Sequence, residues 1–142
     1  MFLIDTNVIS EARMGRRAHP GVRLFFAEAS RQDLPLFLSV ISIGELRRGV
    51  DLIRHRGDGR QADQLEAWLT QVLRDYGERV LVFDSDAAQL WGHLRVPQPE
   101  HSLDKQIAAI ALLHDLTVVT RNTADFASTG VTLLNPFQAP ST

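Results

Sequence analysis

Four acidic residues stand where they could bind a divalent metal ion. Asp5 directly follows an apolar run at the start of the chain, Glu45 follows a second run, Asp104 lies near the start of an expected helix, and Asp125 lies just past a later run. Clustered carboxylates repel one another, and a divalent cation removes that cost. Hard oxygen ligands without cysteine favour Mg²⁺ or Mn²⁺ over zinc. Such a site can activate water and stabilise an in-line attack on phosphate.

Each of these acids also has a purely structural interpretation. Asp5 can cap the helix that follows it, and Ser42 with Glu45 matches the capping box. Asp104 near a helix start interacts favourably with the helix dipole, and Asp125 can close a turn. Taken singly, these are weak signals. The metal site therefore depends on all four acids meeting at one edge of a sheet.

The elements that must position the acids alternate between short apolar strands and amphipathic helices. We expect strands at 2–4, 34–38, 80–83, 116–120 and 131–134, and helices at 6–13, 22–29, 42–56, 61–76, 84–94 and 102–113. Loops are expected at 14–20 and 96–101. This alternation predicts an α/β sandwich, a central, mostly parallel sheet of four to five strands with helices on both faces. Sites in such sheets form at the carboxyl ends of the strands.

The length and composition exclude several classes of protein. With 142 residues, we expect one domain at 1–136 and a short tail at 137–142. The chain has no cysteine, so disulfide scaffolds, cysteine zinc sites and thiol catalysis are excluded. The N-terminus lacks the basic region of a signal peptide, and no apolar stretch is long enough for a membrane span. We therefore expect a cytoplasmic protein without membrane contact.

The basic residues concentrate in the first part of the chain. Residues 1–60 carry a net charge of +3 and residues 61–142 a net charge of −5. One group comprises Arg13, Arg16, Arg17, His19 and Arg23, and a second comprises Arg47, Arg48, Arg54, Arg56 and Arg60. These arginines can track a phosphate backbone, form solvated helix faces, or be covered by a partner protein. The five histidines show no H-x-x-x-H or similar ligand spacing.

Four segments resemble the motifs of the PIN-domain family, in particular its VapC-type toxins. They are Met1–Glu11 (MFLIDTNVISE), Ser39–Gly49 (SVISIGELRRG), Asp104–Ala109 (DKQIAA) and Leu116–Phe126 (LTVVTRNTADF). The matches occur in family order and span nearly the whole chain. The resemblance implies a PIN-like three-layer sandwich and an Mg²⁺- or Mn²⁺-dependent endoribonuclease. It also implies a homodimer, either alone or in a larger complex with a cognate antitoxin, which would inhibit it as part of a type II toxin–antitoxin module.

The resemblance also implies a role for each site residue. Asp5 and Asp104 would be the principal metal ligands, Glu45 would complete the acidic pocket, and Asp125 would be a fourth acid acting through water. The polar residues that would support this pocket are Thr6, Asn7, Thr120 and Asn122.

Several basic residues in or near these motifs have more than one possible role. Arg121 sits next to the expected site and can meet RNA phosphate or form a surface salt bridge, and Arg13, Arg16 and Arg17 are further candidates for RNA contact. Lys105 departs from the family pattern, which commonly has a small or apolar residue after the third acid. We expect Lys105 to steer RNA or to face solvent.

Two other functions compete with the ribonuclease. The chain can be a non-catalytic subunit of a regulatory complex that reaches operator DNA only through its antitoxin. The four acids favour the enzyme, because a binding module gains nothing from repelling phosphate. The chain can also be a receiver-like domain that accepts phosphate on Asp5, but that hypothesis leaves Glu45 and Asp125 unexplained.

Overall fold

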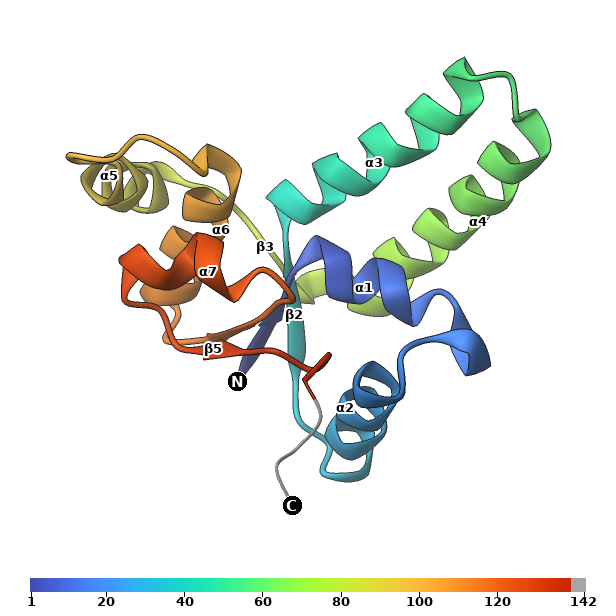
Figure 1. The fold of residues 1–142 in the computed structure, drawn as a ribbon, viewed down its shortest axis with the longest axis horizontal. Coiled ribbons are helices and arrows are strands. Elements are labelled where there is room, and N and C mark those ends of the chain that lie inside the picture. Colours follow the sequence, from blue (N-terminus) through green and yellow to red (C-terminus); the bar gives the residue numbers. More distant parts are fainter. Residues whose placement is uncertain (139–142) are drawn as a thin grey trace.

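The computed structural model describes residues 1–138, and within them the chain forms a parallel sheet with helices on both faces (Figure 1). The five strands are β1 (Phe2–Ile4), β2 (Leu36–Ser39), β3 (Val80–Leu81), β4 (Thr117–Val119) and β5 (Leu133–Leu134). The helices are α1 (Thr6–Ala12), α2 (Pro20–Arg31), α3 (Val40–His55), α4 (Gly59–Tyr76), α5 (Ser85–Leu94), α6 (Ser102–Leu113) and α7 (Thr123–Phe126). This architecture confirms the expected fold class.

The first strand of the chain lies in the middle of the sheet. The strand order is β3-β2-β1-β4-β5, and every neighbouring pair is parallel. Leu3 of β1 stands opposite Phe37 of β2 on one side and Val118 of β4 on the other. The carboxyl ends of β1, β2 and β4 therefore meet at one edge, where the acidic residues follow.

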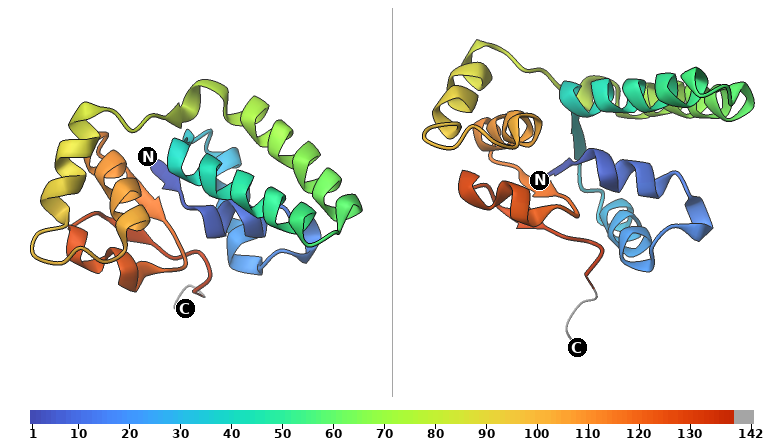
Figure 2. Two further views of the ribbon diagram at one scale, coloured as in Figure 1. Left: turned by 90° about the horizontal axis from the view of Figure 1, so that it is seen from above. Right: turned by 45° about the horizontal axis from the view of Figure 1, so that its top comes forward.

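The two faces of the sheet bury two apolar cores, as alternation of side chains along a strand requires. Leu3 and Val118 pack with Ile107, Ile110 and Phe126 on the face covered by α5, α6 and α7. The opposite core lies under α1 to α4 and contains Ile4, Val8, Val22, Leu38, Leu46, Leu69 and Val119. Figure 2 shows these two helical layers on either side of the sheet. No helix within residues 1–138 combines the length and apolarity needed to cross a membrane.

Helices α3 and α4 form an antiparallel hairpin that extends beyond the sheet (Figure 1). Leu46 and Val50 of α3 and Leu69 and Val72 of α4 are buried in the same core. These residues recur at three- and four-residue steps, which places them on one face of each helix. The apolar face of α3 thus belongs to the core at Leu46 and Val50.

Several element boundaries differ from the sequence-based expectation. Helix α3 begins at Val40, and its cap is Ser39, whose side chain accepts a hydrogen bond from the Ser42 backbone N–H (3.1 Å). The prediction that Ser42 and Glu45 form a capping box is therefore wrong. Glu45 lies in the second turn of α3, so its carboxylate has no capping role.

The expected loop at 14–20, the start of β2 and residue Phe137 also differ from the sequence-based expectation. A short 3₁₀ turn at Gly15–Arg17 interrupts the loop after α1, and Pro20 already belongs to α2. Strand β2 starts at Leu36, because the Leu34 N–H bonds to Ala29 at the end of α2 and Pro35 has no N–H. Phe137, assigned to the tail, packs beside the core under α2, and residues 139–142 lie outside the described residues.

Candidate active site

Asp5 is the most buried of the four acids and is held by three hydrogen bonds. It ends β1 and caps α1, where one carboxylate oxygen accepts from the Thr6 backbone N–H at 2.8 Å. The other oxygen accepts from the Thr120 hydroxyl at 2.7 Å and from the Asn7 amide at 3.2 Å. Only 3% of Asp5 is exposed. Burial raises the pKa of Asp5 despite these three bonds.

Glu45 faces Asp5 from the neighbouring helix α3. The Thr6 hydroxyl lies 3.1 Å from a Glu45 carboxylate oxygen and 3.0 Å from the Ser42 hydroxyl, so it can donate to either. Burial raises the pKa of the Glu45 carboxyl, and the Asp5 carboxylate raises it further. Thr6 therefore links the two acids that come from separate elements of the fold.

Asp104 and Asp125 come from the other helical layer. Asp104 lies in the first turn of α6 and Asp125 in the short helix α7. Burial and the carboxylates of Asp5, Asp125 and Glu45 raise the pKa of Asp104 to about 6. Because all three other acids act on Asp104, the structure brings the four expected acids to one edge of the sheet.

The donor set of this edge fits a hard divalent cation. The described residues place no arginine or lysine within ion-pair distance of these four carboxylates. Carboxylates that repel one another and lack an internal cation are the ligands that Mg²⁺ and Mn²⁺ take in proteins. A bound cation would lower the pKa values that burial and mutual repulsion have raised.

The four supporting polar residues do not contribute equally. Asn7 and Thr120 contact Asp5 directly, and the Thr120 hydroxyl also accepts from the Asn122 backbone N–H at 3.0 Å. The Asn122 side chain does not cap α7. The Arg121 backbone N–H donates to the Asn7 side chain at 3.0 Å, while its guanidinium lies over the Phe137 ring at 4.3 Å from the centroid. Of its two predicted roles, Arg121 forms no salt bridge within residues 1–138 and instead makes a cation–π contact, while contact with RNA phosphate stays a prediction.

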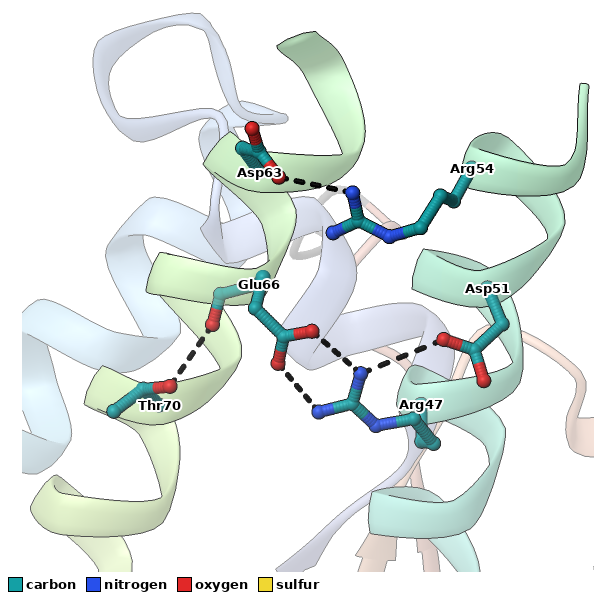
Figure 3. Close-up of polar contacts among 6 residues, drawn as sticks. All are labelled: Arg47, Asp51, Arg54, Asp63, Glu66 and Thr70. Atoms are coloured by element: carbon teal, nitrogen blue, oxygen red, sulfur yellow. Dashed lines mark hydrogen bonds and ion pairs between the residues drawn. The ribbon is translucent and has the colours of Figure 1, made fainter. Parts of the chain in front are cut away.

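The two arginine groups have different environments. Within residues 1–138, exposed Arg13, Arg16 and Arg17 form no ion pair, so their charge is available to a ligand. Arg47 instead makes a bidentate contact with Glu66 and also approaches Asp51 at 3.5 Å. Arg54 pairs with Asp63 at 3.0 Å, so ion pairs join α3 to α4 (Figure 3).

The position of Lys105 contradicts both roles expected from the sequence, which were to steer RNA or to face solvent. It neither faces solvent nor lies free to steer RNA, because it is only 2% exposed and its ammonium donates to the Gln98 carbonyl. The loop before α6 folds back over the Lys105 side chain. A backbone carbonyl thereby satisfies the buried charge without a carboxylate partner.

Two residues of this region escaped the sequence analysis. Ser42 is fully buried and belongs to the hydroxyl contacts of Thr6. His101 lies directly before α6, and its Nδ1 is 3.8 Å from a carboxylate oxygen of Asp125. The histidines have no ligand spacing among themselves, so no pattern of histidines alone predicts a role for His101. His101 lies three residues before Asp104, and side chains at that spacing lie close together near a helix start. This spacing could have identified His101 as a candidate metal ligand.

The chain is similar to known proteins over nearly its whole length. The chain is 35% identical over 143 residues to toxin FitB of Neisseria gonorrhoeae, covering 96% of this chain and 99% of that protein. It is 32% identical over 145 residues to VapC ribonuclease Y4jK of Sinorhizobium fredii, covering 97% and 99%. A solved structure of FitAB bound to an IR36 DNA fragment matches with a TM-score of 0.84 and 30% identity, covering 99% of each chain.

The family assignment rests on a match over most of the chain. A model of the PIN domain matches residues 2–131, a range that includes all four acids and every strand up to β4. The chain belongs to the PIN-domain family.

Proposed function

We propose that this protein is the toxin of a type II toxin–antitoxin module and that it cleaves RNA as a divalent-metal-dependent endoribonuclease. The observation that carries the proposal is the cluster of Asp5, Glu45, Asp104 and Asp125, none of whose carboxylates forms an ion pair with an arginine or lysine of residues 1–138. Relatives named as a toxin and as a ribonuclease support the same assignment.

Asp5 and Asp104 would hold Mg²⁺ or Mn²⁺, with Glu45 and Asp125 completing the site directly or through water. The bound ion would supply a positive charge that stabilises the scissile phosphate and favours ionisation of water. The three hydrogen bonds to Asp5 fix the orientation of its carboxylate before any ligand binds. Such fixed geometry is what a ligand-binding carboxylate needs, since its supporting partners orient it.

Glu45 would take the proton of the attacking water. Its carboxylate is half-buried beside Asp5, where a water bound by the cation would lie within its reach. Thr6 would orient that carboxylate through its hydroxyl, at 3.1 Å, and could turn to Ser42 once Glu45 is protonated. Asp125 would assist from the opposite helical layer.

The free arginines would complement this acidic site. RNA is repelled by four carboxylates, so binding needs positive charge nearby. Arg13 lines the same cavity as Thr6 and Glu45, and Arg16 and Arg17 follow it in the 3₁₀ turn. Arg121 would be a weaker candidate, because its guanidinium already contacts Phe137.

A cognate antitoxin is the expected protein partner. A cavity of about 340 Å³ extends from Thr6 and Glu45 along α3 and α4 to Trp68, next to the acids. A peptide segment in that cavity would block access to the site. FitAB, a relative, has been solved bound to a DNA fragment. As the family resemblance implies, we expect this chain to form a homodimer and to reach operator DNA only through its antitoxin. The expected place of action is the cytoplasm, where RNA is available.

The test is cleavage of total cellular RNA by the purified, antitoxin-free protein with Mg²⁺ or Mn²⁺, followed by mapping of the cut ends. Asp5→Asn should abolish cleavage, because it removes a charged ligand while asparagine still caps α1 well. EDTA should have the same effect on the wild type. Full activity of Asp5→Asn at saturating Mg²⁺ would exclude the assigned site.

A second function is favoured by the relative bound to DNA. In that case this chain would be a non-catalytic subunit that controls operator binding by the toxin–antitoxin complex. Intact RNA, with both the wild type and Asp5→Asn folded, would favour this regulatory function. Operator binding with and without this chain would then be the measurement to make.

A further inference from the structure

His101 belongs to the most compact group of metal-binding side chains in the described part of the chain. One ligand atom each of His101, Asp104 and Asp125 lie within 4.8 Å of one another. The imidazole comes from the loop before α6, and Asp125 comes from α7. The three side chains thus converge from two segments of the same helical layer: the start of α6 with the residue before it, and α7.

The backbone of His101 directs its side chain away from a capping role. Its φ of 57° and ψ of 47° lie in the left-handed region, which non-glycine residues rarely adopt. The imidazole makes no hydrogen bond to the start of α6, although His101 occupies the capping position. A strained backbone of this kind persists where the surrounding structure holds it, and it is enriched at functional sites.

The buried Lys105 holds one side of the loop that carries His101. Its ammonium donates to the Gln98 carbonyl, and its backbone N–H donates to the His101 carbonyl at 2.9 Å. Because Lys105 is only 2% exposed, this anchor is shielded from water. The role that the sequence left open for Lys105 is therefore to fix the loop at the edge of the acid site.

Helix α5 holds the other side of that loop. The Arg95 guanidinium donates to the Pro99 carbonyl at 3.3 Å and lies 4.6 Å from the centroid of the Trp91 ring. The Trp91 indole N–H donates to the Ser102 carbonyl at 3.0 Å. These contacts fix both ends of the loop, so His101 occupies a defined position relative to Asp104 and Asp125.

We propose that His101 is a further ligand of the divalent cation and that its imidazole makes the site prefer Mn²⁺ to Mg²⁺. The inference rests on the proposed metal-dependent function. Carboxylate oxygens serve both ions, whereas Mg²⁺ strongly prefers oxygen and imidazole nitrogen suits transition metals. A nitrogen ligand beside Asp104 and Asp125 therefore adds affinity for Mn²⁺ and little for Mg²⁺.

The direct test is the electron spin echo spectrum of the Mn²⁺-loaded, full-length protein. A coordinated imidazole gives a ¹⁴N modulation of the Mn²⁺ signal, which His101→Asn and His101→Gly should remove. Both replacements tolerate the left-handed backbone, so the loop can keep its conformation. The matched control is His114→Asn, an exposed histidine at the opposite end of α6.

Calorimetric titration with MnCl₂ and MgCl₂ gives the second readout. We expect the His101 variants to bind Mn²⁺ about tenfold more weakly, with Mg²⁺ affinity within about twofold of the wild type. His114→Asn should match the wild type for both ions. Circular dichroism and thermal unfolding of each variant establish that it is folded.

The outcomes separate this inference from the proposed function. Mn²⁺ binding without ¹⁴N modulation, or an equal loss of Mn²⁺ and Mg²⁺ affinity in the variants, would overturn the role of His101 alone. A modulated Mn²⁺ site in a protein that leaves RNA intact would overturn the ribonuclease alone. Absence of Mn²⁺ binding to the wild type would overturn both.

Discussion

The α3–α4 hairpin and the acid site both contain clustered acids, but within residues 1–138 arginines form ion pairs with the acids of the hairpin and not with those of the acid site. In the hairpin, Arg47 contacts Glu66 and lowers the pKa of that carboxyl. At the acid site, burial and neighbouring carboxylates raise the pKa of Asp104 to about 6. The pKa of an acidic residue is thus lowered in the hairpin and raised at the acid site, although helix α3 belongs to both regions.

The difference indicates which charges the protein balances by itself and which it leaves for a ligand. Ion pairs across the hairpin connect two helices that extend beyond the sheet (Figures 1 and 3). At the sheet edge, an arginine or lysine would occupy the position that a cation or a phosphate-bound ion needs. The following experiments test this contrast.

Placing an internal cation in the acid site should have the largest effect. Thr6→Lys brings an ammonium beside Asp5 and Glu45, which Thr6 contacts in the wild type. Two charges about 4 Å apart near a protein surface interact by about 4 kcal/mol. We therefore expect Mn²⁺ affinity to fall at least about a hundredfold, measured by calorimetry.

The control for that variant is Thr70→Lys on the exposed face of α4, which should bind Mn²⁺ like the wild type. Thr6→Val removes the hydroxyl without adding charge and should weaken binding far less than Thr6→Lys. Equal affinities of Thr6→Lys and the wild type would show that the ion binds elsewhere.

Metal binding should stabilise the protein through the acid site only. At a free Mn²⁺ concentration about a hundred times its dissociation constant, the free energy of unfolding should rise by about 2.7 kcal/mol. For a domain of this size the melting temperature then rises by about 5–10 °C, measured by calorimetric scans. Glu66→Gln in the hairpin should show the same increase, and Asp104→Asn should lose most of it. An undiminished increase in Asp104→Asn would exclude Asp104 as a ligand.

Without metal, the acid site should make stability fall as pH rises. The folded-state pKa of Asp104, about 6, lies above its usual 3.8, so the folded protein holds more protons than the unfolded chain between these values. Asp104→Asn should therefore raise the unfolding free energy at pH 7.5 in EDTA by about 1 kcal/mol, allowing for solvent screening.

Denaturant titrations at several pH values measure this effect, and the advantage of Asp104→Asn should vanish below about pH 4. Asp5 and Glu45 are shifted in the same direction and contribute to the same slope. A variant less stable than the wild type at pH 7.5 would mean that the Asp104 carboxylate stabilises the metal-free fold.

Breaking an ion pair of the hairpin should have the smallest effect. Glu66→Gln removes one charge of an exposed contact, so the melting temperature should fall by about 1–2 °C at low ionic strength. Because salt screens exposed charges, the difference should disappear in 1 M NaCl, at a Debye length of about 3 Å. RNA cleavage should be unchanged, whereas a large loss of cleavage would connect the hairpin to the chemistry.

Much of the fold was predictable because apolar runs and helical periodicity are local properties of the chain. The runs around Leu3, Leu38 and Val118 predict buried parallel strands, and the helices that follow them carry buried residues at helical spacing. Strand ends were less predictable, since they depend on pairing partners. Ser39 pairs opposite Leu81 and then caps α3, which no pattern near Ser42 reveals.

The site was predictable at the four acids, because the carboxyl ends of parallel strands share one edge. Its hydroxyl contacts and the position of Lys105 were not, since they depend on segments that meet only in the folded chain. Lys105 is buried because the loop containing Gln98 folds back over it, and that loop has no periodic signal. The roles of Asp5, Glu45, Asp104 and Asp125 in catalysis stay predictions that the experiments above address.

The position of β1 in the middle of the sheet has a consequence for synthesis on the ribosome. Asp5 is made first, but β1 pairs with β4, and Asp125 is translated 120 residues later. At about 5–20 residues per second, that interval lasts roughly 6–24 s. The edge that gathers the four acids cannot form on a nascent chain that lacks its last quarter. Until Asp125 has been translated, the nascent chain therefore carries only part of this group of acids.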